Sequence, residues 1–106
     1  MDKSSLRLLA KDGFTAYPPS ELPVLANWCW DFGVASADAR YFVLSRIFSI
    51  VSEAFGEAEL VTAEVYRGLN DTLVRSLEAI IDEQDPLAAT SLANGLLEDV
   101  LSVLDL

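Results

Sequence analysis

Apolar residues recur at spacings of three to four along most of the chain, which is the pattern of amphipathic α-helices. Five such stretches are separated by glycines, prolines and capping residues, whereas runs of β-branched residues are few. We therefore predict an all-α fold. It is a compact antiparallel bundle of four to five helices, formed by a single domain over residues 1–106.

The first two helices are predicted on either side of a proline-containing segment. The first covers about residues 4–11, and Gly13 is expected to stop it. Residues 14–19 include two adjacent prolines, so this segment is expected to be extended or to turn. Ser20 is the expected N-cap of the second helix, and Gly33 is expected to end that helix.

The third helix is the most apolar, and we expect it to lie at the centre of the bundle. Ser36 or Asp38 can cap its N-terminus, and Gly56 is its expected C-cap. Its apolar stripe consists of Phe42, Ile47, Phe48, Val51 and Phe55.

The fourth helix is predicted over residues 58–83, with a kink or a break near Gly68 because glycine lowers helix propensity. The fifth helix has the clearest start, since Asp85 is a good N-cap and Pro86 occupies the position that proline favours. Gly95 lies inside it and is expected to allow a neighbouring helix to approach closely.

The chain contains no histidine and one cysteine, which excludes most catalytic and metal-binding arrangements. We expect no enzyme activity, no cofactor and no metal. Cys29 lies among apolar residues and is interpreted as a buried, inert thiol rather than a nucleophile. A carboxylate metal site is conceivable, although chance placement in an acid-rich chain explains these residues better. Its ligands would be Glu53, Glu57, Glu64, Glu98 and Asp99.

A single cysteine fits a reducing compartment, and the N-terminus lacks the apolar core of a signal peptide. No run of apolar residues approaches the length that spans a bilayer. We therefore expect a cytoplasmic protein. Its net charge of -10 opposes binding to nucleic acids and to anionic membranes, and it favours a basic protein partner.

The charge is distributed unevenly along the chain. Residues 1–46 contain five acids and five bases, whereas residues 47–106 contain twelve acids and only two bases, Arg67 and Arg75. All ten aromatic residues precede Arg67. The first part is thus aromatic and electroneutral, and the second is aliphatic and acidic.

Acidic residues gather around two predicted helix connections, which lie at opposite ends of the bundle if the helices alternate in direction. Both groups can be solvated helix termini. The second group, however, places carboxylates at a helix C-terminus, which the helix dipole disfavours. Such conflicts are expected at functional places, so we predict that the acids contribute to partner binding. The first group is Glu53, Glu57, Glu59 and Glu64, and the second is Glu78, Asp82, Glu83 and Asp85.

Two aromatic residues are candidate apolar anchors for that partner, Trp30 and Tyr66. Trp28 and Trp30 point in different directions from their helix, so Trp28 is assigned to the core and Trp30 to the surface. The alternative is that Trp30 packs under residues 14–19. Arg40 and Arg46 are expected to pair with acids of other helices.

Residues 39–101 resemble small bacterial immunity proteins, which are encoded beside polymorphic and contact-dependent toxins. The resemblance rests on the order of an apolar helix, a Glu-rich turn and a long helix, followed by a last helix with Asn94, Glu98 and Asp99. Proteins of this class are compact, often acidic, and neutralise a toxin domain by covering or distorting its active site. The resemblance implies an inhibitor and carries no catalytic motif.

Two functions are therefore expected from the sequence. The first is a binding protein that neutralises or sequesters a basic protein, as an immunity protein does with its cognate toxin. The alternative is a structural, adaptor or chaperone-like module that acts through homo- or hetero-oligomerisation. Residues 42–55 are apolar around much of their helix, so part of this apolar surface can form a homodimer interface.

Overall fold

The computed structural model describes residues 3–57 and 61–105, and within these ranges it contains helices and no strand. The α-helices are α1 (Lys3–Asp12), α2 (Leu22–Ser36), α3 (Ala39–Gly56), α4 (Ala63–Asp82) and α5 (Pro86–Leu104). Two short 3-10 turns, η1 (Gly13–Thr15) and η2 (Pro19–Glu21), connect α1 to α2. The predicted all-α class and the bundle architecture are confirmed.

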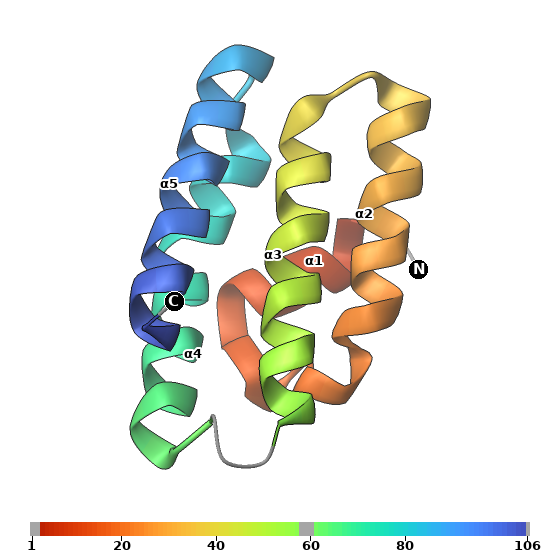
Figure 1. The fold of residues 1–106 in the computed structure, drawn as a ribbon. Coiled ribbons are helices and arrows are strands. Elements are labelled where there is room, and N and C mark those ends of the chain that lie inside the picture. Colours follow the sequence, from red (N-terminus) through yellow and green to blue (C-terminus); the bar gives the residue numbers. More distant parts are fainter. Residues whose placement is uncertain (1–2, 58–60, 106) are drawn as a thin grey trace.

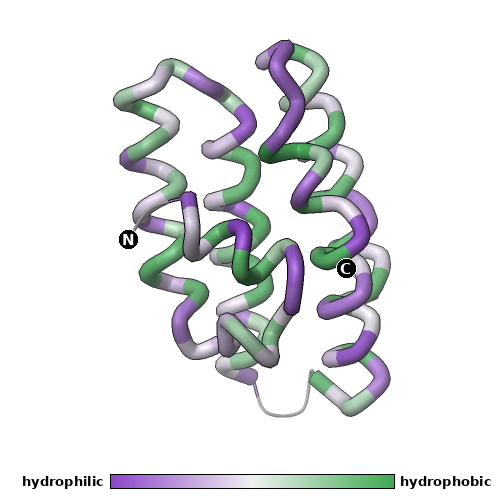
Figure 2. The backbone as a smooth tube through the Cα atoms, turned by 180° about the vertical axis from the view of Figure 1, so that it is seen from behind, coloured by the Kyte–Doolittle hydropathy of each residue, from purple (hydrophilic) through white to green (hydrophobic). Residues whose placement is uncertain are grey.

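The four long helices form two antiparallel hairpins that lie side by side (Figure 1). α2 packs against α3, α3 against α5, and α5 against α4. Seen from behind, α1 crosses the bundle and packs against α4 (Figure 2). The end of α3 and the start of α4 lie at the opposite end of the molecule from the α4–α5 turn, so the described residues of the two acidic groups are separated as predicted (Figure 1).

One continuous core joins all five α-helices. α3 lies at its centre and contributes the fully buried side chains of Leu44, Ile47, Phe48 and Val51. Trp28 is only partly buried and packs against the edge of this core, close to its predicted place. Phe42, which the sequence assigns to the core stripe, is also only partly buried.

Two predictions for the second helix are wrong. Ser20 does not cap α2, because it lies inside η2 and α2 begins at Leu22. Gly33 does not end α2 either, since the helix continues to Ser36 and Ala37 takes the left-handed conformation at its C-cap. Gly33 is instead buried beneath the ring of Phe42, where an added Cβ would lie 3.0 Å from the ring.

The N-caps of α3 and α5 agree with the sequence. The carboxylate of Asp38 accepts a hydrogen bond from the Arg40 backbone N–H. The predicted C-cap of α3 is wrong by one residue, because Gly56 is the last helical residue and Glu57 is the C-cap. The carboxylate of Asp85 accepts from the Leu87 backbone N–H, with Pro86 in the first turn.

α4 differs from its prediction in two respects. It begins at Ala63, where the Thr62 hydroxyl accepts a hydrogen bond from the Val65 N–H, and it continues through Gly68 without a break. The predicted start at residue 58 lies outside the described residues.

Neither the glycine of α4 nor that of α5 has its expected role. A Cβ at Gly68 would lie 3.0 Å from the side chain of Val103, so this glycine lets α4 approach α5 closely. Gly95 is exposed and would meet nothing within 4 Å, so the close approach predicted there is wrong.

α5 is the one described helix that is long and apolar enough to cross a membrane by length and composition. The reading of the sequence did not recognise this property. Ala89, Ala93, Leu96, Val100 and Leu104 of α5 are nevertheless buried against the other helices. The apolar character of α5 is accounted for in part by its place in the bundle core.

Candidate functional site

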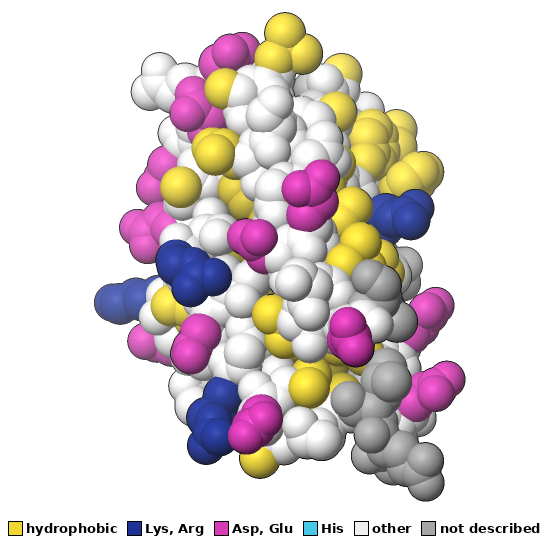
Figure 3. Space-filling view, turned by 60° about the vertical axis from the view of Figure 1, so that its left-hand side comes forward, with side chains coloured by type: hydrophobic (Ala, Val, Ile, Leu, Met, Phe, Trp, Pro, Cys, Tyr) yellow, Lys and Arg dark blue, Asp and Glu magenta, His cyan; other side chains and the backbone are white. Residues whose placement is uncertain are grey.

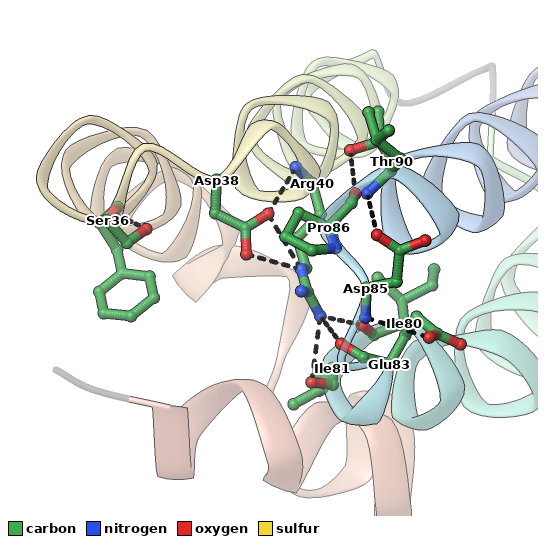
Figure 4. A network of polar contacts seen from close by, with 11 residues as sticks. Ser36, Asp38, Arg40, Ile80, Ile81, Glu83, Asp85, Pro86 and Thr90 are labelled. Atoms are coloured by element: carbon green, nitrogen blue, oxygen red, sulfur yellow. Dashed lines mark hydrogen bonds and ion pairs between the residues drawn. The ribbon is translucent and has the colours of Figure 1, made fainter.

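At the α4–α5 end of the bundle, Arg40 of α3 reaches the C-terminus of α4 (Figure 4). Its side chain is 5% exposed. Nη1 donates hydrogen bonds to the carbonyl oxygens of Ile80 (2.8 Å), Ile81 (3.3 Å) and Glu83 (2.7 Å). Nε donates to both carboxylate oxygens of Asp38, each at 3.0 Å. Arg40 thus satisfies carbonyl groups that a helix C-terminus leaves without partners.

This contact resolves the electrostatic conflict that the sequence posed at the end of α4. A cation does stabilise that C-terminus, but it comes from α3 and not from α4 itself. The expected pairing of Arg40 with an acid of another helix is wrong, because its ion pair is with Asp38 just before its own helix. Arg46 is exposed and forms no ion pair with any described residue, so its expected pairing is also wrong.

Three of the four candidate acids at this end make contacts within the protein. Asp82 accepts a hydrogen bond from Arg7 at 2.7 Å, and this contact and the charge of Asp82 raise the pKa of Arg7. The carboxylate of Glu83 accepts from the Asp85 N–H at 3.2 Å, and Asp85 caps α5. Glu78 is exposed. The acids of this turn therefore serve the fold, in addition to any role in binding.

The other acidic end lies at the α3–α4 connection. Glu57 follows the last residue of α3 and is its C-cap, whereas Glu64 lies in the first turn of α4. Both are exposed, and Glu59 lies outside the described residues. Tyr66 is 37% exposed and packs against Phe14, with ring centroids 5.2 Å apart.

A shallow hollow of about 440 Å³ adjoins Tyr66 at this end. Its walls are mainly apolar, with Phe55 and Val61, and they include one carboxylate, Glu57, and one guanidinium, Arg67. Tyr66 therefore offers an aromatic surface beside one negative and one positive side chain, and its role as an anchor stays a prediction.

Trp30 lies on a third part of the surface, on the outer side of α2. It is 54% exposed, and its ring contacts Phe42 of α3 at a centroid distance of 4.7 Å. The alternative, in which Trp30 packs under residues 14–19, is wrong. Val34, one turn further along α2, is 62% exposed. We call Trp30, Val34 and Phe42 the Trp30 patch.

The two C-terminal helices carry most of the excess charge on their outer faces, which we call the acidic α4–α5 surface (Figure 3). Residues 61–105 contain nine acids and two bases, and among described residues only Asp82 of these acids forms an ion pair. Eight of the nine are exposed and Glu83 is partly buried. The nine are Glu64, Asp71, Glu78, Asp82, Glu83, Asp85, Glu98, Asp99 and Asp105.

A groove of about 320 Å³ runs along the acidic α4–α5 surface between the two helices. Ala79, Leu92 and Gly95 form much of its apolar wall, and Arg75 and Asp99 lie at its polar positions. Leu92 is 44% exposed. The sequence prediction missed this groove, although the open position of Gly95 opposite the small side chain of Ala79 creates it.

Cys29 is fully buried, and burial raises the pKa of its thiol to about 12. It is therefore held as the neutral thiol, and the predicted burial of Cys29 in the core is confirmed. Among the described side chains, no three His, Cys, Asp or Glu residues lie close enough together to hold a metal ion.

The candidate residues thus fall into separate places and do not form one site. Glu57, Glu64 and Tyr66 lie at one end, the group from Glu78 to Asp85 lies at the other, and Trp30 lies on α2 (Figure 1). Val34 of the Trp30 patch was not predicted as a binding residue. Its place beside Trp30 could have been predicted, because Val34 follows Trp30 by one helical turn.

Comparisons of the chain with protein-family models, with curated proteins and with solved structures find no match.

Proposed function

We propose that this chain is a binding protein that engages a basic protein partner through the acidic α4–α5 surface. One observation carries the proposal. Nine acids against two bases lie on residues 61–105, and the described part of the fold uses only one of these nine in an ion pair. Glu83 and Asp85 accept hydrogen bonds from backbone N–H groups, which leaves the other six carboxylates available to a partner.

Long-range electrostatic attraction also supports the proposal. Carboxylates clustered on neighbouring helices produce a negative potential that attracts a basic protein and accelerates its association. Solubility alone would be served by acids anywhere on the surface, including on α2 and α3. The concentration of acids on α4 and α5 therefore favours a directed role.

Tight binding also needs apolar contacts, because exposed ion pairs contribute little on their own. The groove between α4 and α5 meets this need, since Leu92 and Ala79 offer an apolar recess within the acidic surface. Tyr66 lies on α4 near the end of the same helix pair and is the second candidate anchor. Tyr66 is turned away from α5 towards Phe14 and Phe55, so it is an anchor separate from the groove.

The specific form that we propose is an immunity protein that inhibits a cognate toxin. The active site of a nuclease binds phosphate groups and is therefore positively charged. A surface of carboxylates can occupy that space and exclude the nucleic acid. The resemblance of residues 39–101 to immunity proteins supports this form of the proposal.

The test uses the purified proteins encoded by the neighbouring genes, with binding to the full chain measured by surface plasmon resonance across NaCl concentrations. We expect one neighbour to bind, with an association rate that falls about tenfold as salt reduces the Debye length from about 14 to 4 Å. Co-expression of the chain should also relieve the toxicity of that neighbour.

A matched pair of variants locates the surface. Glu98→Gln with Asp99→Asn should slow association several-fold, whereas Asp12→Asn with Glu21→Gln should leave it nearly unchanged. Both variants remove two exposed charges of the same kinds, so only their position differs. The proposal fails if no neighbour binds, if association ignores salt, or if the two variants behave alike.

A further inference from the structure

We propose that the outer side of α2 and α3 is a docking face for a second copy of this chain. This α2–α3 face consists of the Trp30 patch and its polar surroundings. Trp30, Val34 and Phe42 supply its apolar part, and Asp31, Arg46 and Glu53 supply its charges.

The apolar part of the α2–α3 face is built as a rigid surface. Gly33 lies directly under Phe42, so that the ring of Phe42 rests on the backbone of α2. Trp30 then packs against the ring of Phe42 at a centroid distance of 4.7 Å. Aromatic side chains held in this way lose little conformational entropy when they are covered, which favours their use as contact residues.

Charge distinguishes this face from the acidic α4–α5 surface and indicates what can cover it. Residues 22–56 contain three acids and two bases, Arg40 and Arg46, whereas residues 61–105 contain nine acids and two bases. In a two-fold symmetric dimer each face meets its own copy. Two acidic α4–α5 surfaces would repel each other, whereas two nearly neutral α2–α3 faces would not.

The exposed charges on the face also suit a contact with itself. Arg46 is exposed one helical turn beyond Phe42, and it forms no ion pair with any described residue. Asp31 and Glu53 are exposed on the same pair of helices. A two-fold contact can therefore place the Arg46 guanidinium of each copy near a carboxylate of the other.

The size of the face indicates a weak dimer. Two helices of 15 and 18 residues side by side present an area of about 20 by 25 Å. Burying about 500 Å² on each copy lies at the lower limit for specific protein interfaces, so we expect a dissociation constant of about 10–100 µM.

This inference is independent of the proposed function. α2 lies on the opposite side of the molecule from α4, so dimerisation leaves both acidic α4–α5 surfaces free (Figure 1). Salt separates the two ideas, because screening reduces the repulsion between two copies of charge -10 but weakens the attraction of a basic partner. Added NaCl should tighten the dimer and loosen the partner complex.

The first experiment is sedimentation equilibrium of the full chain and of two variants over about 1–300 µM, a range that brackets the expected dissociation constant. The wild type should shift from monomer to dimer, and Trp30→Gln should weaken the dimer at least tenfold. Leu87→Gln removes an apolar side chain that is 81% exposed on α5 and should leave the dimer intact. Circular dichroism verifies that each variant is folded.

A second pair of variants tests the charge argument without altering an aromatic residue. Arg46→Glu and Arg75→Glu both change the net charge from -10 to -12, and both arginines are exposed. Arg46→Glu should weaken the dimer several-fold more than Arg75→Glu. A chain that stays monomeric over the whole range, or that responds equally to the two arginine variants, overturns the inference.

Discussion

The α2–α3 hairpin and the α4–α5 hairpin have the same local architecture but expose different chemistry. The first carries seven of the ten aromatic residues within residues 22–56, whereas α5 contains none. Its charge is nearly balanced, while the second hairpin carries nine acids against two bases. Since both hairpins contribute to a single core, their outer faces are free to differ, and we assign a different partner to each.

The two hairpins also differ in how their helices are joined. In the first, the buried Ser45 hydroxyl donates a hydrogen bond to the Ala26 carbonyl at 2.8 Å, and Phe42 rests on Gly33. In the second, aliphatic side chains pack together, and Gly68 admits Val103. Arg40 connects the hairpins, because it belongs to α3 and binds the C-terminus of α4.

Replacing Arg40, which joins the two hairpins, should therefore reduce the stability of the protein more than any other substitution predicted below. We expect Arg40→Ala to lower the free energy of unfolding by about 3 kcal/mol, because it leaves Asp38 and the carbonyl groups at the end of α4 without their partner. Urea denaturation followed by circular dichroism at 222 nm measures this loss.

Arg46→Ala is the matched control, since Arg46 lies six residues further along the same helix and is exposed. It should change the free energy of unfolding by less than about 0.5 kcal/mol. Equal losses in the two alanine variants would contradict the role of Arg40 as the link between the hairpins.

The sequence predicted the helices where a local signal was strong. Asp85 and Pro86 mark the start of α5 because N-capping and the proline position depend only on neighbouring residues. The N-cap predicted at Ser20 and the helix end predicted at Gly33 are wrong because serine and glycine also have other structural roles. Ser20 lies in a 3-10 turn, and Gly33 is required by the packing of Phe42 from another helix.

The candidate site was harder to predict because its charges interact across helices. The acids at the end of α4 have no basic neighbour in the sequence, yet Arg40 of α3 binds the Glu83 carbonyl and Arg7 of α1 pairs with Asp82. Arg7 and Asp82 are 75 residues apart in the chain, and patterns of neighbouring residues cannot predict a contact over that separation. The uneven charge of residues 61–105, by contrast, was visible at once and persists on the folded surface.

The interior of the α2–α3 hairpin should be sensitive to high pH through Cys29. Burial raises its pKa from 9.0 to about 12, so the protein binds this proton more tightly when folded than when unfolded. The resulting stabilisation is complete below pH 9 and is lost as the pH rises from 9 towards 12. We expect the free energy of unfolding to fall by about 1.4 kcal/mol between pH 8 and pH 10 from this group.

Urea denaturation at several pH values, with and without Cys29→Ala, measures this contribution. The alanine variant should be less stable at pH 8, because it creates a cavity, but its stability should depend less steeply on pH. Burial, the charge of Glu21 and, as the smallest cause, Cys29 also raise the pKa of Tyr17, so the part due to burial and Glu21 appears in both proteins and cancels in the comparison. Identical slopes would show that the thiol is not protected as the structure indicates.

The smallest predicted effect concerns the two glycines of the α4–α5 hairpin. Gly95→Ala should stabilise the protein by about 0.5–1 kcal/mol, because alanine is the better helix former and the added Cβ meets nothing within 4 Å. Gly68→Ala brings the same gain in helix propensity but places its Cβ 3.0 Å from Val103, which must shift. Thermal unfolding should show a higher midpoint for Gly95→Ala than for Gly68→Ala. The reverse order would mean that Gly95, and not Gly68, is where the second hairpin needs its closest approach.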